Sequence, residues 1–190
     1  MGSICEQALS VSVGTIKEYT MELVAAEKIE DCVCEEIDLM SENPKSIFNL
    51  GYELGRFAFD NEGNGLAAPQ VGIFRRIIVF QGNDGLMMIA VNPRYFPQGS
   101  RTQIVEGCLS YPGDRYLMKR YKSVRAMFFT FNSEKKIIAK NIILRGHAAI
   151  VFQHETDHLN GITIAMKGKF FGHVAPEEVK EADTNSLPSN

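Results

Sequence analysis

The feature that most constrains this chain is the run His154-Glu155-Thr156-Asp157-His158, which follows the pattern HExxH. Residues four apart in a helix lie one above the other on the same face, so the two histidines can bind one metal ion. Glu155 can then serve as a base for water at that metal. The pattern therefore requires a helix here and predicts a metal-dependent hydrolase. A buried histidine pair with a purely structural role is the alternative.

A third metal ligand is needed, and the segment Glu106-Gly107-Cys108-Leu109-Ser110 offers the best candidate in Cys108. A cysteine is a good soft ligand once deprotonated, and a bound metal lowers the pKa of its thiol. Gly107 permits unusual backbone geometry beside it. The alternative is that Cys108 is a small buried hydrophobic residue.

The segment GNGLAAPQ at residues 63–70 is the third feature with chemical content. Its two glycines and two alanines leave the backbone bare, so that a substrate chain can lie close to it. Gln70 brings a neutral amide donor, which can stabilise an oxyanion without competing for the metal. The alternative is a loop between a helix and a strand, with Gln70 on the surface.

The helix that carries HExxH also predicts a hydrophobic pocket beside the metal. Ile150 and Val151 lie four and three residues before His154, and His147 lies seven before it. At these spacings all three share its face, roughly. We expect them to line a pocket for an apolar side chain, although Ile150 and Val151 would also serve as ordinary core residues.

The composition indicates one folded domain. The 190 residues are 45% hydrophobic, enough to bury one core. A formal net charge of −3 and a pI near 5.8 argue against direct nucleic-acid binding.

No apolar run reaches the roughly 18–20 residues that span a bilayer, and the N-terminus lacks the features of a secretory signal or transit peptide. The spacing of the four cysteines indicates no disulfide framework. We expect a cytoplasmic protein without membrane contact.

The apolar periodicity predicts helices first, then strands, then one helix. The expected elements are one or two amphipathic helices in 15–40, a helix that begins at Asn43-Pro44 and ends near Gly63, hairpins that pair 76–80 with 86–91 and 124–131 with 136–144, and a helix over 148–159 that Gly161 ends. This order is typical of an α+β fold, with antiparallel or mixed sheets packed around a central metal-binding helix. We expect a flexible arm at 1–14, one catalytic domain at 15–172 and a disordered acidic tail at 173–190.

Taken together, the three motifs resemble the signature motifs of the peptide deformylases, in the same order along the chain. Residues 63–70 match the family's Gly-x-Gly-apolar-Ala-Ala-x-Gln pattern, and residues 106–110 match Glu-Gly-Cys-apolar-Ser in full. Residues 153–161 match the pattern Gln-His-Glu-x-Asp-His-Leu-x-Gly. The resemblance covers roughly residues 44–165. The first forty residues lack the family's Pro-x-x-Leu-Arg-like opening.

The resemblance implies a role for each matching residue. Cys108, His154 and His158 would bind one divalent metal, usually ferrous iron, with zinc, nickel or cobalt able to replace it. Glu155 would act as the base, and Gln70 and the backbone N–H of Leu109 would hold the oxyanion. The residues expected to contact substrate are Gly63, Gly65, Glu106, Gly107, Arg115, His147, Ile150 and Val151. Arg120 would pair with Glu106 in a structural role.

The implied reaction is removal of the formyl group from N-formylmethionyl nascent peptides, with release of formate and a possible transient contact with the ribosome. Two rival hypotheses stay open from the residues alone. An HExxH metallopeptidase would need a ligand downstream of His158, where only His173 is available, and would leave the other two motifs unexplained. A non-catalytic binding protein of the same fold would have no need for an intact set of ligands and base.

Overall fold

The computed structural model of the protein describes residues 21–175. Six antiparallel strands form one sheet in the order β1-β2-β3-β4-β5, and β6 pairs with β4. The strands are β1 Gly65–Ala67, β2 Ile77–Gln81, β3 Met87–Cys108, β4 Tyr111–Phe131, β5 Ile137–Arg145 and β6 Lys169–His173. The helices are α1 Pro44–Asp60, α2 Gly146–Leu159 and the short α3 Ile164–Lys167, with 3-10 turns η1 Ala26–Lys28 and η2 Ala68–Val71. The expected α+β class is confirmed.

Helix α1 has the ends that its sequence predicts. The Asn43 side chain accepts a hydrogen bond from the backbone N–H of Lys45, and Pro44 occupies the first turn. The helix ends when Glu62 adopts a left-handed φ of 57°, which lets the N–H of Gly63 reach the carbonyl of Ala58 at 2.8 Å. Helix α1 therefore delivers the chain directly into the 63–70 segment.

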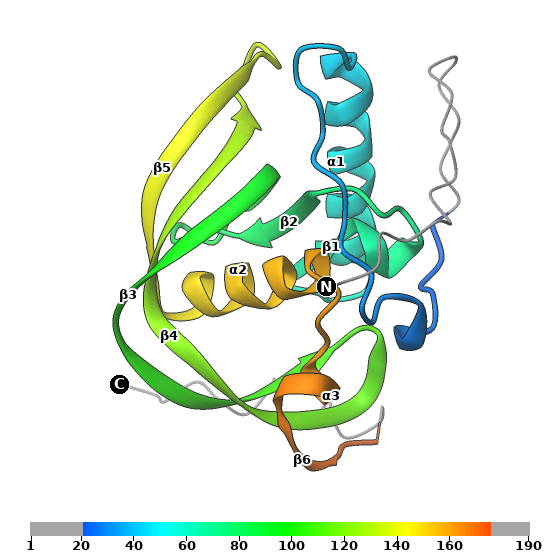
Figure 1. The fold of residues 1–190 in the computed structure, drawn as a ribbon, viewed down its shortest axis with the longest axis vertical. Helices are drawn as coiled ribbons and strands as arrows, with labels where there is room; N and C mark the ends of the chain where they lie inside the picture. Colours follow the sequence, from blue (N-terminus) through cyan, green and yellow to red (C-terminus); the bar gives the residue numbers. More distant parts are fainter. Residues whose placement is uncertain (1–20, 176–190) are drawn as a thin grey trace, which may run out of the picture.

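The sheet separates two hydrophobic cores because successive residues of a strand face opposite sides. On β2, Ile77 and Val79 pack in the core with α1, whereas Ile78 and Phe80 pack in the core with α2. Figure 1 shows α2 across the middle of the molecule, with β4 and β5 arching around it and α1 beyond β1 and β2. Phe152 anchors α2, since its ring centroid lies 4.9 Å from that of Phe80.

Strands β3 and β4 are much longer than the hairpin segments that the sequence predicts. Their pairing is interrupted by register shifts between Val91 and Arg94, between Gln98 and Arg101, and between Glu106 and Cys108. Such irregularities bend a strand, and they let one long hairpin curve around α2 and end with Cys108 facing it. The predicted pairings around 76–91 and 124–144 are confirmed, within these longer strands.

The expectation of amphipathic helices in 15–40 is wrong for its described part, residues 21–40, which contains only the turn η1. Apart from the short turns around η1, the backbone of this segment bonds to other elements. The N–H of Asp31 donates to the carbonyl of Gly161, and the N–H of Cys34 donates to that of Leu159, both at 2.9 Å. The buried Ile29 and Ile37 face the domain as single anchors. Tertiary pairing therefore overrides the local helical spacing.

The two ends of the chain lie partly outside the described residues. The arm expected at 1–14 lies outside the described residues, as does the tail from residue 176. The expected domain boundary at 173 falls at the last residue of β6, and the N–H of Val174 still donates to the carbonyl of Gly113 at 2.8 Å.

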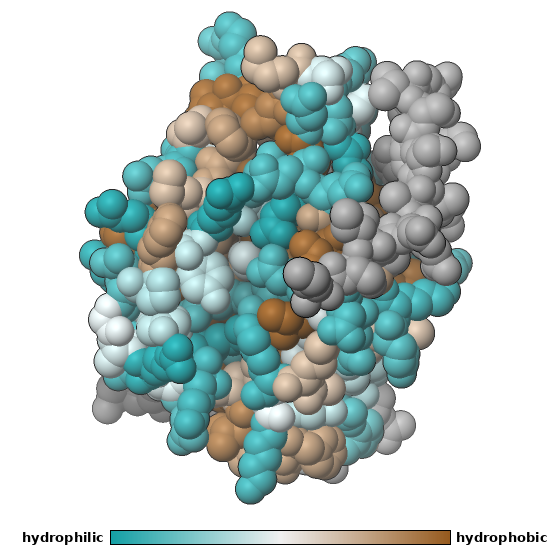
Figure 2. Space-filling model, viewed as in Figure 1, coloured by the Kyte–Doolittle hydropathy of each residue, from teal (hydrophilic) through white to brown (hydrophobic). Residues whose placement is uncertain are grey.

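In Figure 2, hydrophobic residues gather over the ends of β4 and β5 near α1, with smaller patches among hydrophilic residues. Among the residues described, no helix has the length and apolar character to cross a membrane.

Two glycines on α1 predict opposite responses to alanine. A Cβ on Gly51 would lie 2.6 Å from Cγ2 of the β-branched Ile89, which has little freedom to move, whereas a Cβ on Gly55 would meet nothing closer than 3.7 Å. Gly51→Ala should lower the free energy of unfolding by about 1–3 kcal/mol through overpacking. Gly55→Ala should raise it by up to about 1 kcal/mol through helix propensity. Urea denaturation of both variants measures this, and equal responses would contradict the packing described.

Candidate active site

Two ligand-bearing elements converge at the centre of the fold. Helix α2 presents His154 and His158, whose Nε2 atoms lie 3.2 Å apart. Cys108, the last residue of β3, places its Sγ 3.4 Å from Nε2 of His158. The ligand atoms of these three residues all lie within 4.8 Å of one another. Cys108 and His158, which are 50 positions apart in the sequence, are therefore within reach of a single ion.

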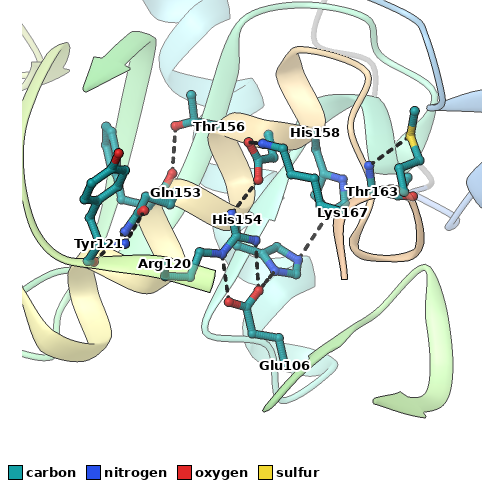
Figure 3. Close-up of polar contacts among 12 residues, drawn as sticks. Glu106, Arg120, Tyr121, Gln153, His154, Thr156, His158, Thr163 and Lys167 are labelled. Atoms are coloured by element: carbon teal, nitrogen blue, oxygen red, sulfur yellow. Dashed lines mark hydrogen bonds and ion pairs between the residues drawn. The ribbon is translucent and has the colours of Figure 1, made fainter. Parts of the chain in front are cut away.

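Glu106 orients the first histidine. One of its carboxylate oxygens lies 2.9 Å from Nδ1 of His154, and Arg120 donates to both oxygens at 2.8 and 2.9 Å. Figure 3 shows dashed lines from the Glu106 carboxylate to the guanidinium of Arg120 and to the imidazole ring of His154. Because a carboxylate only accepts, Nδ1 of His154 donates to Glu106, and this contact fixes the orientation of the ring. Burial would raise the pKa of Glu106, but the hydrogen bonds from His154 and Arg120 outweigh it and lower that pKa to about 2.

The expected pairing of Arg120 with Glu106 is thus present, and the structure adds a partner that the sequence analysis missed. Asp157, buried on α2, forms ion pairs with Arg120 and with Lys167 at the end of α3. The aspartate inside the HExxH pattern was the available signal, because a buried carboxylate requires a partner. Arg120 therefore joins β3, β4 and α2 at the back of the site.

Glu155 lies on the same helix, almost fully buried, and its Oε2 atom has no hydrogen-bond partner among the described residues. Burial raises its pKa to about 7. An unpartnered buried carboxylate oxygen is unusual in a folded protein. The Glu155 carboxylate, next to His154 in the sequence, therefore has a pKa near neutrality and an oxygen free to accept a proton.

Gln70, in the turn η2, reaches the same point from the opposite side. Its Oε1 accepts from the N–H of Ala67 at 2.9 Å, which fixes the orientation of the amide. Its Nε2 then points to Sγ of Cys108 at 3.5 Å and to Oγ of Ser110 at 3.2 Å. The amide donor of the first motif therefore lies beside the thiol of the second. Ser110 is a neighbour that the sequence analysis did not single out.

The glycines of the motifs serve close packing in the structure. A Cβ on Gly65 would lie 2.7 Å from Oε1 of Glu155 and 2.8 Å from Val151, so the space beside Gly65 is filled by α2. A Cβ on Gly63 would contact the Leu109 side chain at 3.1 Å. At Gly107 it would lie 2.7 Å from the guanidinium of Arg115. The bare backbone thus brings the three motifs together, and Arg115 extends over the second of them.

The three residues expected to line a side-chain pocket differ in their surroundings. Val151 is buried against Gly65, and Ile150, the residue before it in α2, is partly exposed. His147 is exposed in the first turn of the helix. Val151 and Ile150 therefore lie within the turn before His154, whereas His147 is at the surface, one turn further away.

The donor set fits a divalent transition metal. One sulfur and two imidazole nitrogens are the ligands that zinc and iron accept, and three protein ligands leave a position open for water or substrate. The hydrogen bond from His154 to Glu106 is the kind of outer contact that orients a metal-binding imidazole. Within the described part of the chain, the group formed by Cys108, His154 and His158 meets the geometric requirement for such a site.

Comparison with known proteins agrees with this geometry. The polypeptide deformylase family profile matches residues 20–170. A peptide deformylase of Fusobacterium nucleatum is 38% identical over 111 residues, which are 57% of this chain and 61% of that protein. One of Acetivibrio thermocellus is 33% identical over 135 residues, which are 71% of this chain and 75% of that protein. The match therefore spans about three fifths of the first relative and three quarters of the second.

A solved structure extends the likeness to the fold. The Met-Ala-Ser-bound class I type b peptide deformylase from Acinetobacter baumannii aligns with a TM-score of 0.69 and 25% sequence identity, over 80% of this chain and 99% of that chain. The profile match covers most of this chain, and the Acetivibrio alignment exceeds 30% identity over three quarters of that protein. The chain therefore belongs to the polypeptide deformylase family.

Proposed function

We propose that this chain hydrolyses the formyl amide of N-formylmethionyl peptides, using a divalent metal held by Cys108, His154 and His158. The observation that carries the proposal is the convergence of these three ligand atoms within 4.8 Å, beside a buried carboxylate with an unpartnered oxygen. The metal would be ferrous iron, with zinc, nickel or cobalt as substitutes. When bound, it supplies Lewis acidity, which polarises a carbonyl group and makes water acidic at neutral pH.

In this mechanism Glu155 moves the proton. Its carboxylate takes a proton from water at the site, and the water oxygen forms a bond to the formyl carbon. The C–N bond then breaks, and the same proton passes from Glu155 to the departing amine, so that formate and a free N-terminus are released. The pKa of about 7 suits a group that must accept and return a proton near neutrality.

Gln70 and Leu109 stabilise the negative charge that develops on the formyl oxygen. The Gln70 amide is held by Ala67, so that its Nε2 faces Cys108 without reorganisation. The backbone N–H of Leu109 adds a second donor next to the thiolate. Preorganised donors of this kind are effective because they need not reorient as the charge appears.

The substrate chain would lie along the strands that flank the site. Gly63 and Gly65 offer backbone groups from β1 and its approach, and Arg115 over Gly107 can contact the peptide from the other side. Glu106 acts through His154, since its carboxylate is already occupied by Arg120 and that ring.

The methionine side chain would lie against Ile150 and Val151, with His147 at the outer edge. The Met-Ala-Ser ligand of the Acinetobacter baumannii structure has the length and chemistry of such a product. We infer one catalytic domain over 15–172, which acts on nascent chains in the cytoplasm, with at most brief contact with the ribosome.

Substitution of the base and of the sulfur ligand should have different effects. Glu155→Gln keeps the ligand set, so the variant should bind metal normally and lose about 10²–10⁴-fold in kcat. Cys108→Ser removes the soft ligand, so it should lose the metal itself. Formate release from formyl-Met-Ala-Ser, together with metal analysis of the purified proteins, measures both effects.

Two controls complete this experiment. Exposed Glu134→Gln, in the turn between β4 and β5, should leave both metal content and rate unchanged. Internal cleavage of the peptide without formate release would indicate a peptidase and overturn the proposal. Near-full turnover by Glu155→Gln would remove the carboxylate from the mechanism.

Removal of the metal should abolish the reaction reversibly. A chelator-treated protein should release no formate, because water at neutral pH is then too weak a nucleophile for the amide. Activity should return on addition of Fe²⁺ under anaerobic conditions, and also of Ni²⁺ or Co²⁺. Formate release before and after reconstitution is the measurement, and full activity of the metal-free protein would contradict the proposed chemistry.

A further inference from the structure

Three distant segments meet in one hydrogen-bonded cluster beside the site. The hydroxyl of Tyr111 donates to Oε1 of Glu30 at 2.8 Å, and the hydroxyl of Thr163 donates to the same oxygen at 2.9 Å. The two hydroxyl oxygens lie 3.1 Å apart. Thr163 is almost fully buried, and Glu30 and Tyr111 are partly buried. The Glu30–Tyr111–Thr163 cluster has no part in the mechanism described above.

Tyr111 is closely coupled to the sulfur ligand. It is the cross-strand partner of Cys108 where β3 turns into β4, with only Leu109 and Ser110 between them. Because the connection has only two residues, a contact that fixes Tyr111 also restricts the backbone of Cys108 across from it. Burial raises the pKa of Tyr111 to about 12, so its hydroxyl remains a donor throughout the working range of pH. Tyr111 therefore ties the backbone of Cys108 to Glu30.

Thr163 and Glu30 are coupled in turn to the helix that carries the histidines. Thr163 lies five residues after His158, just beyond the end of α2. The segment around Glu30 crosses this end, where Asp31 and Cys34 donate to the carbonyls of Gly161 and Leu159. The two segments pack closely at this point, since a Cβ on Gly161 would lie 2.6 Å from the backbone N of Cys32. Movement of Glu30 would thus move the end of α2.

The connection from Glu106 to Tyr111 is consequently fastened to α2 on both sides of Cys108. On one side, Glu106 contacts His154 at 2.9 Å. On the other, Tyr111 reaches the end of α2 through Glu30 and Thr163. Resting on the proposed function, we propose that Glu30, Tyr111 and Thr163 are positioning residues that set the separation between Cys108 and the two histidines, and thereby the affinity of the site for its metal.

The affinity for Co²⁺ tests the proposal, because it can be measured separately from the stability of the fold. The purified metal-free protein is titrated with Co²⁺, and the absorption band of the thiolate–cobalt bond reports ligation by Cys108. Tyr111→Phe and Thr163→Val each remove one hydroxyl and keep the shape of the side chain. Each should weaken Co²⁺ binding about three- to tenfold, which corresponds to one net hydrogen bond. The turnover number of the cobalt-loaded enzyme should change less than the affinity.

Glu30 and a surface tyrosine supply the matched controls. Glu30→Gln keeps an oxygen that accepts from both hydroxyls, so it should retain more Co²⁺ affinity than Glu30→Ala, which removes the acceptor of both and should weaken binding at least as much as Tyr111→Phe. Tyr52→Phe on α1, where the side chain is 59% exposed, should bind Co²⁺ like the parent protein. Urea denaturation without metal accompanies each titration, so that loss of folding is separated from loss of affinity.

Two results would overturn the proposal. In the first, Tyr111→Phe and Thr163→Val bind Co²⁺ with unchanged affinity and band and lose only stability, which would give the cluster a merely structural role. In the second, the parent protein binds no Co²⁺ through Cys108, which removes the proposed function as well. A parent protein that binds Co²⁺ but releases no formate would overturn the proposed function alone, and the variant titrations would still decide the role of the cluster.

Discussion

The structure depends on one constraint, which is that its most polar helical segment is also its most buried. Six consecutive residues of α2, Gln153 to His158, are buried under the sheet. Each buried polar group costs about 1–3 kcal/mol if it is left without a hydrogen bond, so the surrounding elements must supply partners. They do so for Gln153 from the backbone of Tyr121, for His154 from Glu106 and for Asp157 from Arg120 and Lys167. Two atoms of this run are left without a hydrogen-bond partner among the described residues, Nδ1 of His158 and Oε2 of Glu155, and the second belongs to the carboxylate that the proposed reaction needs free.

Arg120 satisfies this constraint in a way that no lysine could. Its Nε and Nη2 each donate to one oxygen of Glu106, and its Nη1 pairs with Asp157. A guanidinium presents these donors in a fixed plane, whereas an ammonium group is a single point of charge. The arginine also balances two buried carboxylates together with Lys167, whose side chain is 44% exposed. The strand that carries Cys108 and the helix that carries the histidines are thus joined through the side chain of Arg120.

The sequence predicts the parts of this fold that depend on neighbours along the chain. The cap at Asn43, the hairpins and the helix that carries the HExxH pattern are local patterns, and the structure contains each of those elements. The same reasoning fails for residues 21–40, because apart from the short turns around η1 their backbone bonds to distant residues, among them Gly161 and Leu159. The partners of Asp157 and the Glu30–Tyr111–Thr163 cluster are equally non-local. These contacts join segments that are far apart in the chain, so no residue spacing in the sequence predicts them.

The glycine at position 65 illustrates how a correct motif can have a different physical basis from the one its composition suggests. A bare backbone predicts room for a substrate chain, yet the missing Cβ faces α2, where Oε1 of Glu155 lies only 2.7 Å from the position that a Cβ would take. Any side chain here would displace Glu155 and Val151, and with them the histidine between them in the helix. The first and third motifs therefore occur together because one provides the close approach that the other requires. A strand of three residues, β1, in this way limits where the Glu155 carboxylate can lie relative to the two histidines.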